Sequence, residues 1–175
     1  MSNYTAPERD ESSRPRWQRL LVLVVSSKPG AALLRKVMHR IDRPLLRLTR
    51  GRVSFVSAYP VLLLTTTGAR SGKQRTVPLL YVRCGSGFAI IGTRFGSTHH
   101  PGWYYNLRAR PQATVEIDGT QHACVARAAD EGEREEIWER AVRMYSGYER
   151  YAARTHRTIP MLILEPAPGS LQRLA

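Results

Sequence analysis

The stretch TTTGARSGKQRTVPLLY, residues 65–81, decides the fold of this chain. It follows the apolar run 61–64, which is typical of a buried strand. Gly68 and Gly72 then bracket a tight polar turn, after which apolar residues resume at the two-residue spacing of a strand between 77 and 81. The stretch therefore predicts a β-hairpin with a polar loop.

The loop of this hairpin carries polar side chains that suit an anion. They are Arg70, Ser71, Lys73 and Arg75. Glycines allow backbone N–H groups to approach a ligand closely, and guanidinium and ammonium groups supply positive charge. The order of the residues differs from that of a phosphate-binding P-loop, and no helix is predicted to follow. The pattern predicts an anion-binding loop, with an ordinary solvated turn as the alternative.

The composition is that of a strongly basic globular protein. The chain has 175 residues and a formal net charge of +13, which arginine supplies almost alone. The length favours one compact domain, and the charge indicates an acidic partner: nucleic acid, an anionic membrane surface or a polyanionic small molecule. Cys84 and Cys124 lack metal-type spacing and are expected to be unpaired thiols of a cytoplasmic protein. No apolar run approaches the length of a transmembrane helix.

The sequence divides into three parts. Residues 1–15 are polar, show no periodicity and are expected to be disordered. Residues 16–50 form a basic segment with two expected helices, 17–27 and 34–48, in which apolar residues recur between arginines. Such a segment suits the surface of an anionic membrane, or it packs on the rest of the protein or on a partner subunit. Residues 51–175 form a β-rich domain.

Turn signals and apolar runs predict further strands around the hairpin. They cover residues 53–56, 88–92, 113–117, 121–128 and 159–165. Pro101 and Pro111 flank a short helix, and Asp130 with Glu133 makes a capping box for a later one. The later helix is expected to carry Ile137, Ala141, Tyr145 and Tyr148 on one stripe. The predicted fold class is mainly β with added helices, about six antiparallel strands closing into a small barrel.

Motifs for covalent or metal chemistry are absent from the sequence. It contains no serine or cysteine nucleophile motif, no His-Glu helix motif and no Rossmann fingerprint. His99 and His100 are adjacent, so they cannot easily share one ion, and we predict no metal site. A cationic loop, a second loop at 93–96 and two aromatic helices remain. Such a set can hold a cofactor that carries the reaction while the protein orients it.

Five segments of the chain form an ordered set of motifs: LLTTTGARSG at 63–72, RTVPL at 75–79, PGWYYNL at 101–107, MYSGY at 144–148 and RTIP at 157–160. These motifs resemble those of the deazaflavin-dependent nitroreductase family. The similarity runs in order from about Val61 to Pro166. It implies a split β-barrel of the FMN-binding type that binds coenzyme F420, a 5-deazaflavin with a phosphodiester and an oligoglutamate tail. The reduced cofactor would pass hydride to a quinone, a nitroaromatic or a similar acceptor.

The resemblance also implies which residues bind the cofactor. Arg70, Ser71, Gly72, Lys73 and Arg75 are similar to the loop on its phosphate and tail, and Thr76, Val77, Pro78, Leu79 and Leu80 to the stretch beside its ring. Gly92, Thr93 and Arg94 are similar to a second binding loop, and Gly102, Trp103, Tyr104, Tyr105 and Asn106 to a helical start beside the phosphate. The sequence departs from the family at Ala69, where some members have a basic residue, and at Phe95, where a glycine is common.

Tyr145, Tyr148 and Tyr151 resemble the tyrosines that line the acceptor side. The hydroxyls of Tyr145 and Tyr148 would then be the catalytic groups, stabilising charge on the acceptor oxygen. Two alternatives stay open: a split barrel that binds FMN or another ligand, and a basic nucleic-acid-binding module. Because the aromatics cluster apart from the arginine-rich stretches, we expect no nucleic-acid partner. A homodimer and a peripheral position on the inner face of the membrane, through residues 17–50, are further expectations.

Overall fold

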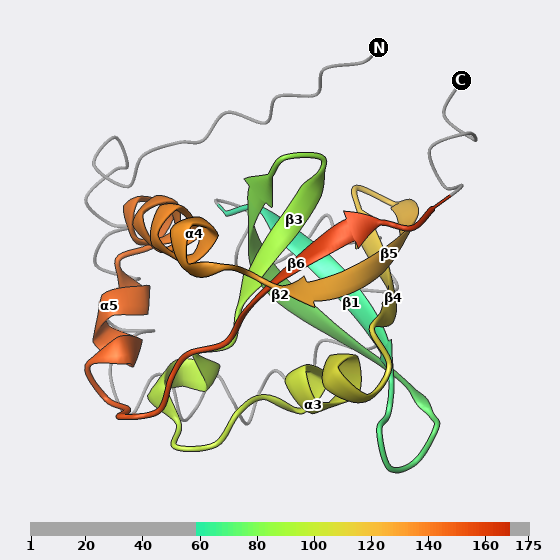
Figure 1. Ribbon diagram of the computed structural model, residues 1–175, viewed down its shortest axis with the longest axis horizontal. Helices are drawn as coiled ribbons and strands as arrows, with labels where there is room; N and C mark the ends of the chain where they lie inside the picture. The colour runs from blue at the N-terminus through green and yellow to red at the C-terminus, as the bar shows by residue number, and fades with distance from the viewer. Residues whose placement is uncertain (1–58, 169–175) are drawn as a thin grey trace.

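Six antiparallel strands close on themselves as a barrel in the order β1-β2-β3-β6-β5-β4. The computed structural model describes residues 59–168, and Figure 1 shows the barrel at its centre. The strands are β1 Val61–Thr67, β2 Gln74–Cys84, β3 Gly87–Ile91, β4 Gln112–Ile117, β5 Thr120–Ala128 and β6 Met161–Pro166. The predicted fold class, a mainly β barrel of about six antiparallel strands with added helices, is confirmed.

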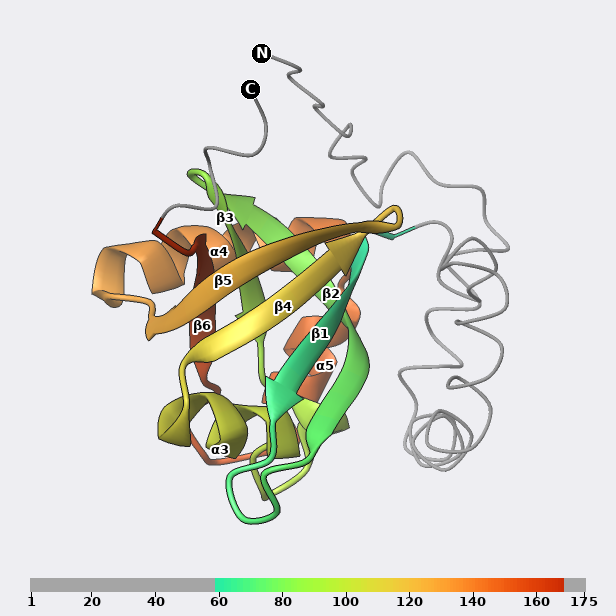
Figure 2. The same cartoon turned by 90° about the vertical axis from the view of Figure 1, so that its right-hand side faces the viewer.

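The helices cover one side and one end of the barrel. They are the 3-10 turn η2 Arg94–Gly96, α3 Gly102–Ala109, α4 Glu131–Met144 and α5 Gly147–Ala152. Figures 1 and 2 show α3 across one end of the barrel, whereas α4 and α5 lie against its side. Among the helices of residues 59–168, none is long and apolar enough to cross a membrane.

The core has two clusters because β3 and β6 are buried on both faces. The barrel-interior cluster consists of Leu62, Leu64, Tyr81, Phe88, Ile90, Trp103, Leu107, Val115, Cys124, Leu162 and Leu164. The helix-side cluster consists of Val82, Ala89, Ile91, Ala129, Ile137, Ala141, Tyr145, Tyr148, Tyr151, Met161 and Ile163. Successive residues of a strand point to opposite faces, so β3 sends Phe88 and Ile90 inward and Ala89 and Ile91 toward α4 and α5.

Most of the predicted local structure is confirmed. β1 and β2 pair as the expected hairpin, and Asp118 and Gly119 turn between β4 and β5 with φ angles of +50° and +82°. The capping box at the start of α4 is present in full, with Asp130 and Glu133 each accepting a backbone N–H from the other. The cysteines are unpaired, as expected.

Two details of the sequence interpretation were wrong. Arg75 belongs to strand β2, opposite Thr66, and not to the hairpin loop. The single late helix is in fact two, because Tyr145 takes an extended conformation that ends α4. The break depends on Gly147, since a Cβ there would collide with the Tyr145 ring. The expected helices 17–27 and 34–48, the strand 53–56 and the tail 1–15 lie outside the described residues.

Arg127, near the end of β5, connects this strand to helix α4 and to strand β6. Its guanidinium donates to both carboxylate oxygens of Glu133 at 2.6 Å and to Oε1 of Glu165 at 2.7 Å. Glu133 lies in the first turn of α4 and Glu165 in β6. The hydrogen bonds from Arg127, with one from the Asp130 backbone, lower the pKa of Glu133 to about 2. This network therefore fixes the start of α4 against the barrel.

We expect Arg127→Gln to lower the melting temperature by a few degrees at pH 7. Because the folded state depresses the pKa of Glu133, its contribution is complete above the ordinary carboxyl pKa near 4.5 and disappears as pH falls toward about 2. The difference between variant and parent, measured by circular dichroism, should shrink across that window. Arg83→Gln, which removes an exposed strand arginine that lies over Phe88, is the control and should show no such pH dependence.

Candidate functional site

Three chain segments with exclusively basic charge meet at the end of the barrel that α3 covers. They are the hairpin tip at 68–76, the stretch 92–112 and the link from α5 to β6 at 153–160, and Figures 1 and 2 show all three at this end. The first two carry three Arg or Lys residues each and the third carries two, and none contains Asp or Glu. We call this surface the cationic end. The excess of basic over acidic residues in these segments creates a positive potential that attracts anions.

The hairpin loop is folded tightly by its own backbone. The Gly68 N–H donates to the Lys73 carbonyl at 2.9 Å, the Gly72 N–H donates to the Gly68 carbonyl at 2.8 Å, and Gly72 takes a φ of +66°. Arg70, Ser71 and Lys73 are exposed. Within residues 59–168 no carboxylate pairs with the basic side chains of this hairpin. They are therefore available to an anionic ligand.

Helix α3 holds this loop in place through Asn106. Its Oδ1 accepts the Ala69 N–H at 3.0 Å, and its Nδ2 donates to Oγ1 of the buried Thr66 at 3.0 Å. Arg110 adds a hydrogen bond to the Gly68 carbonyl at 3.2 Å. The amide of Asn106, which the sequence analysis expected beside the cofactor, is thus used to support the cationic loop. No pattern in the sequence indicates this contact, because its partners lie about forty residues away.

We expect Asn106→Ala to destabilise the protein by about 1–3 kcal/mol, because it leaves the Thr66 hydroxyl and the Ala69 N–H without their partner. Urea unfolding measures the loss, and amide exchange at Ala69 should accelerate. Gln112→Ala, at an exposed first position of β4, is the matched control and should leave both quantities unchanged. Equal stability of the Asn106 variant and the parent would show that water replaces the amide.

The other residues expected at the start of α3 differ in exposure. Gly102 is exposed, with no atom within 4 Å of a Cβ placed there, and Tyr105 is 47% exposed. Trp103 is buried in the barrel-interior cluster, so it anchors the helix. Tyr104 packs its ring against His100 at 4.7 Å. The helix therefore exposes Gly102 and Tyr105 and uses Trp103 for packing.

Strand β2 leads away from the hairpin loop with a half-buried apolar edge. Thr76 is exposed and hydrogen-bonds through its hydroxyl to the hydroxyl of Thr65 at 2.8 Å. The residues from Val77 to Leu80 are all half-buried. Val77 and Leu79 pack on the barrel interior and Leu80 on the helix side. An apolar strand beside a cationic loop suits a ligand that has a flat ring and an anionic tail.

The loop after β3 carries the second group of predicted residues. Gly92 and Thr93 are buried, and the Gly92 N–H donates to the Pro160 carbonyl at 2.8 Å. Arg94 is exposed, and its Nη1 donates to the His100 carbonyl at 2.9 Å. Of these three residues, Arg94 therefore has the side chain that can reach a ligand from this loop.

His100 lies against the guanidinium of Arg157. Its Nδ1 accepts a hydrogen bond from Nη1 of Arg157 at 3.0 Å. Burial, followed by the positive charges of Arg157 and Arg108, lowers the pKa of the imidazole, so the ring is neutral at pH 7. Nδ1 of His99 bonds to the Thr98 hydroxyl, and residues 59–168 hold no group of three side chains that could bind a metal ion.

Tyr145, Tyr148 and Tyr151 form one buried aromatic group. The hydroxyls of Tyr145 and Tyr151 hydrogen-bond to each other at 2.9 Å, and the ring of Tyr148 lies 5.6 Å from that of Tyr145. Burial raises the pKa of all three hydroxyls, so they stay protonated at neutral pH. Phe95 packs edge-on against Tyr151 at 5.6 Å. The three tyrosines therefore come together as predicted, within the helix-side core and in contact with the loop after β3.

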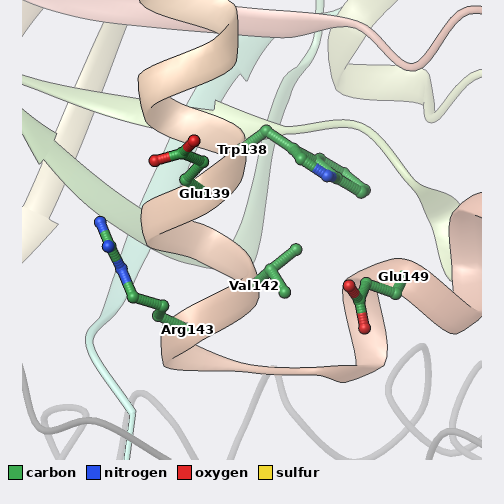
Figure 3. A pocket seen from close by; sticks show the side chains of 5 residues that line it. All are labelled: Trp138, Glu139, Val142, Arg143 and Glu149. Atoms are coloured by element: carbon green, nitrogen blue, oxygen red, sulfur yellow. The ribbon is translucent and has the colours of Figure 1, made fainter.

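A shallow depression of about 290 Å³ lies between α4 and α5, outside the cationic end (Figure 3). Its walls are Trp138, Glu139, Val142, Arg143 and Glu149. None of the predicted site residues lines it. With two carboxylates at its rim, it does not suit the anionic ligand that the cationic end favours.

Comparison with known proteins places these features in a family. The family model described as F420H(2)-dependent quinone reductase matches residues 38–166. An F420H(2)-dependent quinone reductase of Mycobacterium tuberculosis strain H37Rv is 31% identical over 130 residues, covering 71% of this chain and 87% of that protein. A second protein of that strain, described as a putative F420H(2)-dependent quinone reductase, is 31% identical over 121 residues, 69% of this chain and 99% of its own.

Two solved structures are similar as well. One is an F420-H2 dependent reductase, FDR-A, with a TM-score of 0.56 and 39% identity, covering 61% of this chain and 94% of that one. The other is described as a domain-swapped dimer, with a TM-score of 0.56 and 32% identity, covering 86% of this chain and 96% of that one.

Proposed function

Because this chain belongs to the F420H(2)-dependent quinone reductase family, we propose that it is an oxidoreductase that transfers hydride from reduced coenzyme F420 to a quinone or a similar acceptor. The observation that carries the proposal is the cationic end, a basic surface whose three segments contain no Asp or Glu, beside the half-buried edge of β2. This donor set fits a cofactor with an anionic tail and a flat ring. Its charges attract the tail, and its apolar strand accepts the ring.

Different residues bind different parts of the cofactor. Arg70, Lys73 and Arg75 attract the phosphate and the carboxylates of the tail, while Ser71 and the backbone at Gly72 offer further hydrogen-bond donors. The stretch 76–80 supports the ring. Arg94, Gly102 and Tyr105 are the exposed members of the second loop and the helical start, and they offer further contacts to the cofactor.

The chemistry of the step is the cofactor's: when bound, reduced F420 supplies a hydride to an acceptor ring. The protein excludes water, holds the two rings together and stabilises the negative charge that develops on an acceptor oxygen. Tyr145 and Tyr148 are our candidates for that last role, with Tyr151 beside them on the acceptor side. Because burial raises the pKa of each hydroxyl, each keeps its proton to donate and cannot act as a base at neutral pH.

A titration with three ligands tests this function. Oxidised F420, FMN and duplex DNA are each added to the full-length protein, and ring absorbance and fluorescence are followed. We expect saturable binding of F420 that weakens with added salt, since ion pairs contribute to it. Tighter binding of FMN would favour the ligand-binding alternative, and preferential binding of DNA would favour a nucleic-acid module. Either result would overturn the proposal.

We also propose that the protein is cytoplasmic, attaches peripherally to anionic membranes through residues 17–50, and forms a homodimer. The basic amphipathic pattern of that segment supports attachment, and a quinone acceptor would be met at the same surface.

The relative described as a domain-swapped dimer supports self-association. Co-sedimentation with anionic vesicles at low and high salt tests the first idea, and light scattering tests the second. Absence of salt-sensitive sedimentation would refute membrane attachment.

A further inference from the structure

The loop after β3 adopts a backbone conformation that its residues do not favour. Three successive residues, Arg94, Phe95 and Gly96, have positive φ angles of 47°, 57° and 77°. Glycine adopts this region readily, whereas arginine and a bulky phenylalanine do so at an energetic cost. Other parts of the protein must therefore stabilise the loop.

Arg157 supplies that support from the far end of the sequence. Its Nη2 donates to the carbonyls of Gly92 at 2.8 Å and Thr93 at 2.9 Å, and its Nε donates to the carbonyl of Ser97 at 2.9 Å. These carbonyls lie on both sides of the three residues with positive φ. One planar guanidinium thus bridges the two ends of the loop, a geometry that the fixed fork of arginine allows and an ammonium does not.

The same side chain reaches the entrance of helix α3. Its Nη1 donates to Nδ1 of His100, and the His100 ring packs against Tyr104. Among residues 59–168 no carboxylate pairs with Arg157, whose charge is met by backbone carbonyls. Arg157 therefore links the loop after β3 to the start of α3.

The loop in turn rests on the tyrosine group. Phe95 packs on Tyr151, and a Cβ placed on Gly96 would lie 2.9 Å from the Tyr151 carbonyl and 2.7 Å from Cβ of Arg154. Such close approach means that the loop cannot shift without disturbing α5. The position of this loop is thus coupled to the cofactor side and to the acceptor side of the site.

We propose that Arg157 is a positioning residue, which sets the conformation of the loop 92–97 and thereby the geometry of the cofactor site. The identity of the ligand rests on the proposed function. The structural half of the proposal, that Arg157 sets the conformation of the loop 92–97, does not depend on it. Arg157 acts through the backbone carbonyls of Gly92, Thr93 and Ser97. Charge by itself is not sufficient, because the bridge requires three donors in one plane.

The test compares Arg157→Lys and Arg157→Gln with a matched pair, Arg134→Lys and Arg134→Gln. Arg134 also donates to a backbone carbonyl, that of Ile159 at 3.2 Å, but from α4 and outside the loop. Amide hydrogen exchange is measured first, in protein without cofactor. The Gly96 and Ser97 amides donate to the Thr93 and Arg94 carbonyls, so they report on the loop directly. We expect both Arg157 variants to exchange these amides about tenfold faster or more, with the Arg134 variants unchanged.

Binding of F420 by fluorescence titration is the second measurement. Both Arg157 variants should lose about tenfold or more in affinity, with Arg157→Lys keeping the salt dependence of the parent because it keeps the charge. Thr155→Val removes a weaker hydrogen bond of 3.4 Å to the same Ser97 carbonyl and should have a small effect in the same direction. If the glutamine variant does not fold, the lysine variant and Thr155→Val still decide the question.

Three results would overturn the proposal. Unchanged exchange in both Arg157 variants would show that the loop holds its conformation without the guanidinium. Full binding by Arg157→Lys would show that charge alone suffices, and lost affinity with unchanged exchange would make Arg157 a direct ligand contact. The exchange measurement needs no cofactor, so it decides the structural half even if the parent fails to bind F420, a failure that would instead overturn the proposed function.

Discussion

Replacing Arg70 and Arg75 together by glutamate is expected to weaken F420 binding more than any other change at the cationic end. Loss of one charge-assisted contact typically costs about 1–3 kcal/mol. The single variants Arg70→Ala and Arg75→Ala should therefore each bind F420 about 5- to 150-fold more weakly than the parent. The double glutamate variant adds repulsion of the anionic tail to both losses. Fluorescence titration should then show no saturation in the concentration range that saturates the parent.

The control for this prediction keeps the change in net charge and moves it elsewhere. Arg83 in β2 and Arg143 in α4 are exposed and lie outside the cationic end. Their double glutamate variant should bind F420 nearly as well as the parent at physiological salt, because screening limits the reach of distant charges. Equal losses in the two double variants would mean that only the overall charge matters. Retained affinity in the Arg70 and Arg75 variant would show that the hairpin tip is only a solvated turn.

The barrel was predictable because its signals are local. Alternating apolar residues, glycine turns and the Asp118–Gly119 corner each specify a strand or a turn within ten residues of themselves. Antiparallel neighbours joined by short turns then leave few ways to arrange six strands. The capping box at Asp130 and Glu133 is local in the same sense, so the start of α4 was predicted correctly.

The errors and omissions concern contacts between distant residues. The end of α4 depends on room for the Tyr145 ring over Gly147, a packing fact that helical periodicity does not contain. Asn106 reaches the hairpin across 37 residues, and Arg157 reaches Gly92 across 65. Sequence patterns do not distinguish these residues from the many other polar side chains of the protein. Their roles become visible only when the strands bring the segments together.

The predicted tyrosines show both what local sequence patterns can predict and what they cannot. Their proximity was predicted from helical spacing, yet the structure achieves it across a break between two helices. Their burial, with less than 8% of each exposed, follows from the cover that α4 and α5 give to β3 and β6. Tyr145 and Tyr151 already use their hydroxyls on each other, so removing either one also removes a core hydrogen bond. Tyr148 is consequently the cleaner position for a test of catalysis.

Tyr148→Phe is expected to lower turnover of a quinone acceptor by about 10²–10³-fold, the effect of removing one donor that stabilises a developing oxyanion, or about 2.7–4 kcal/mol of barrier. The ring and its packing remain, so the melting temperature and F420 affinity should stay close to those of the parent. Tyr145→Phe should lower turnover and also stability, by about 0.5–1.5 kcal/mol, because it breaks the hydrogen bond to Tyr151. Tyr81→Phe, in the barrel interior, controls for the loss of a buried hydroxyl. Parental turnover in both the Tyr148 and the Tyr145 variants would place the stabilising donor elsewhere, and the tyrosines would then serve only as walls of the site.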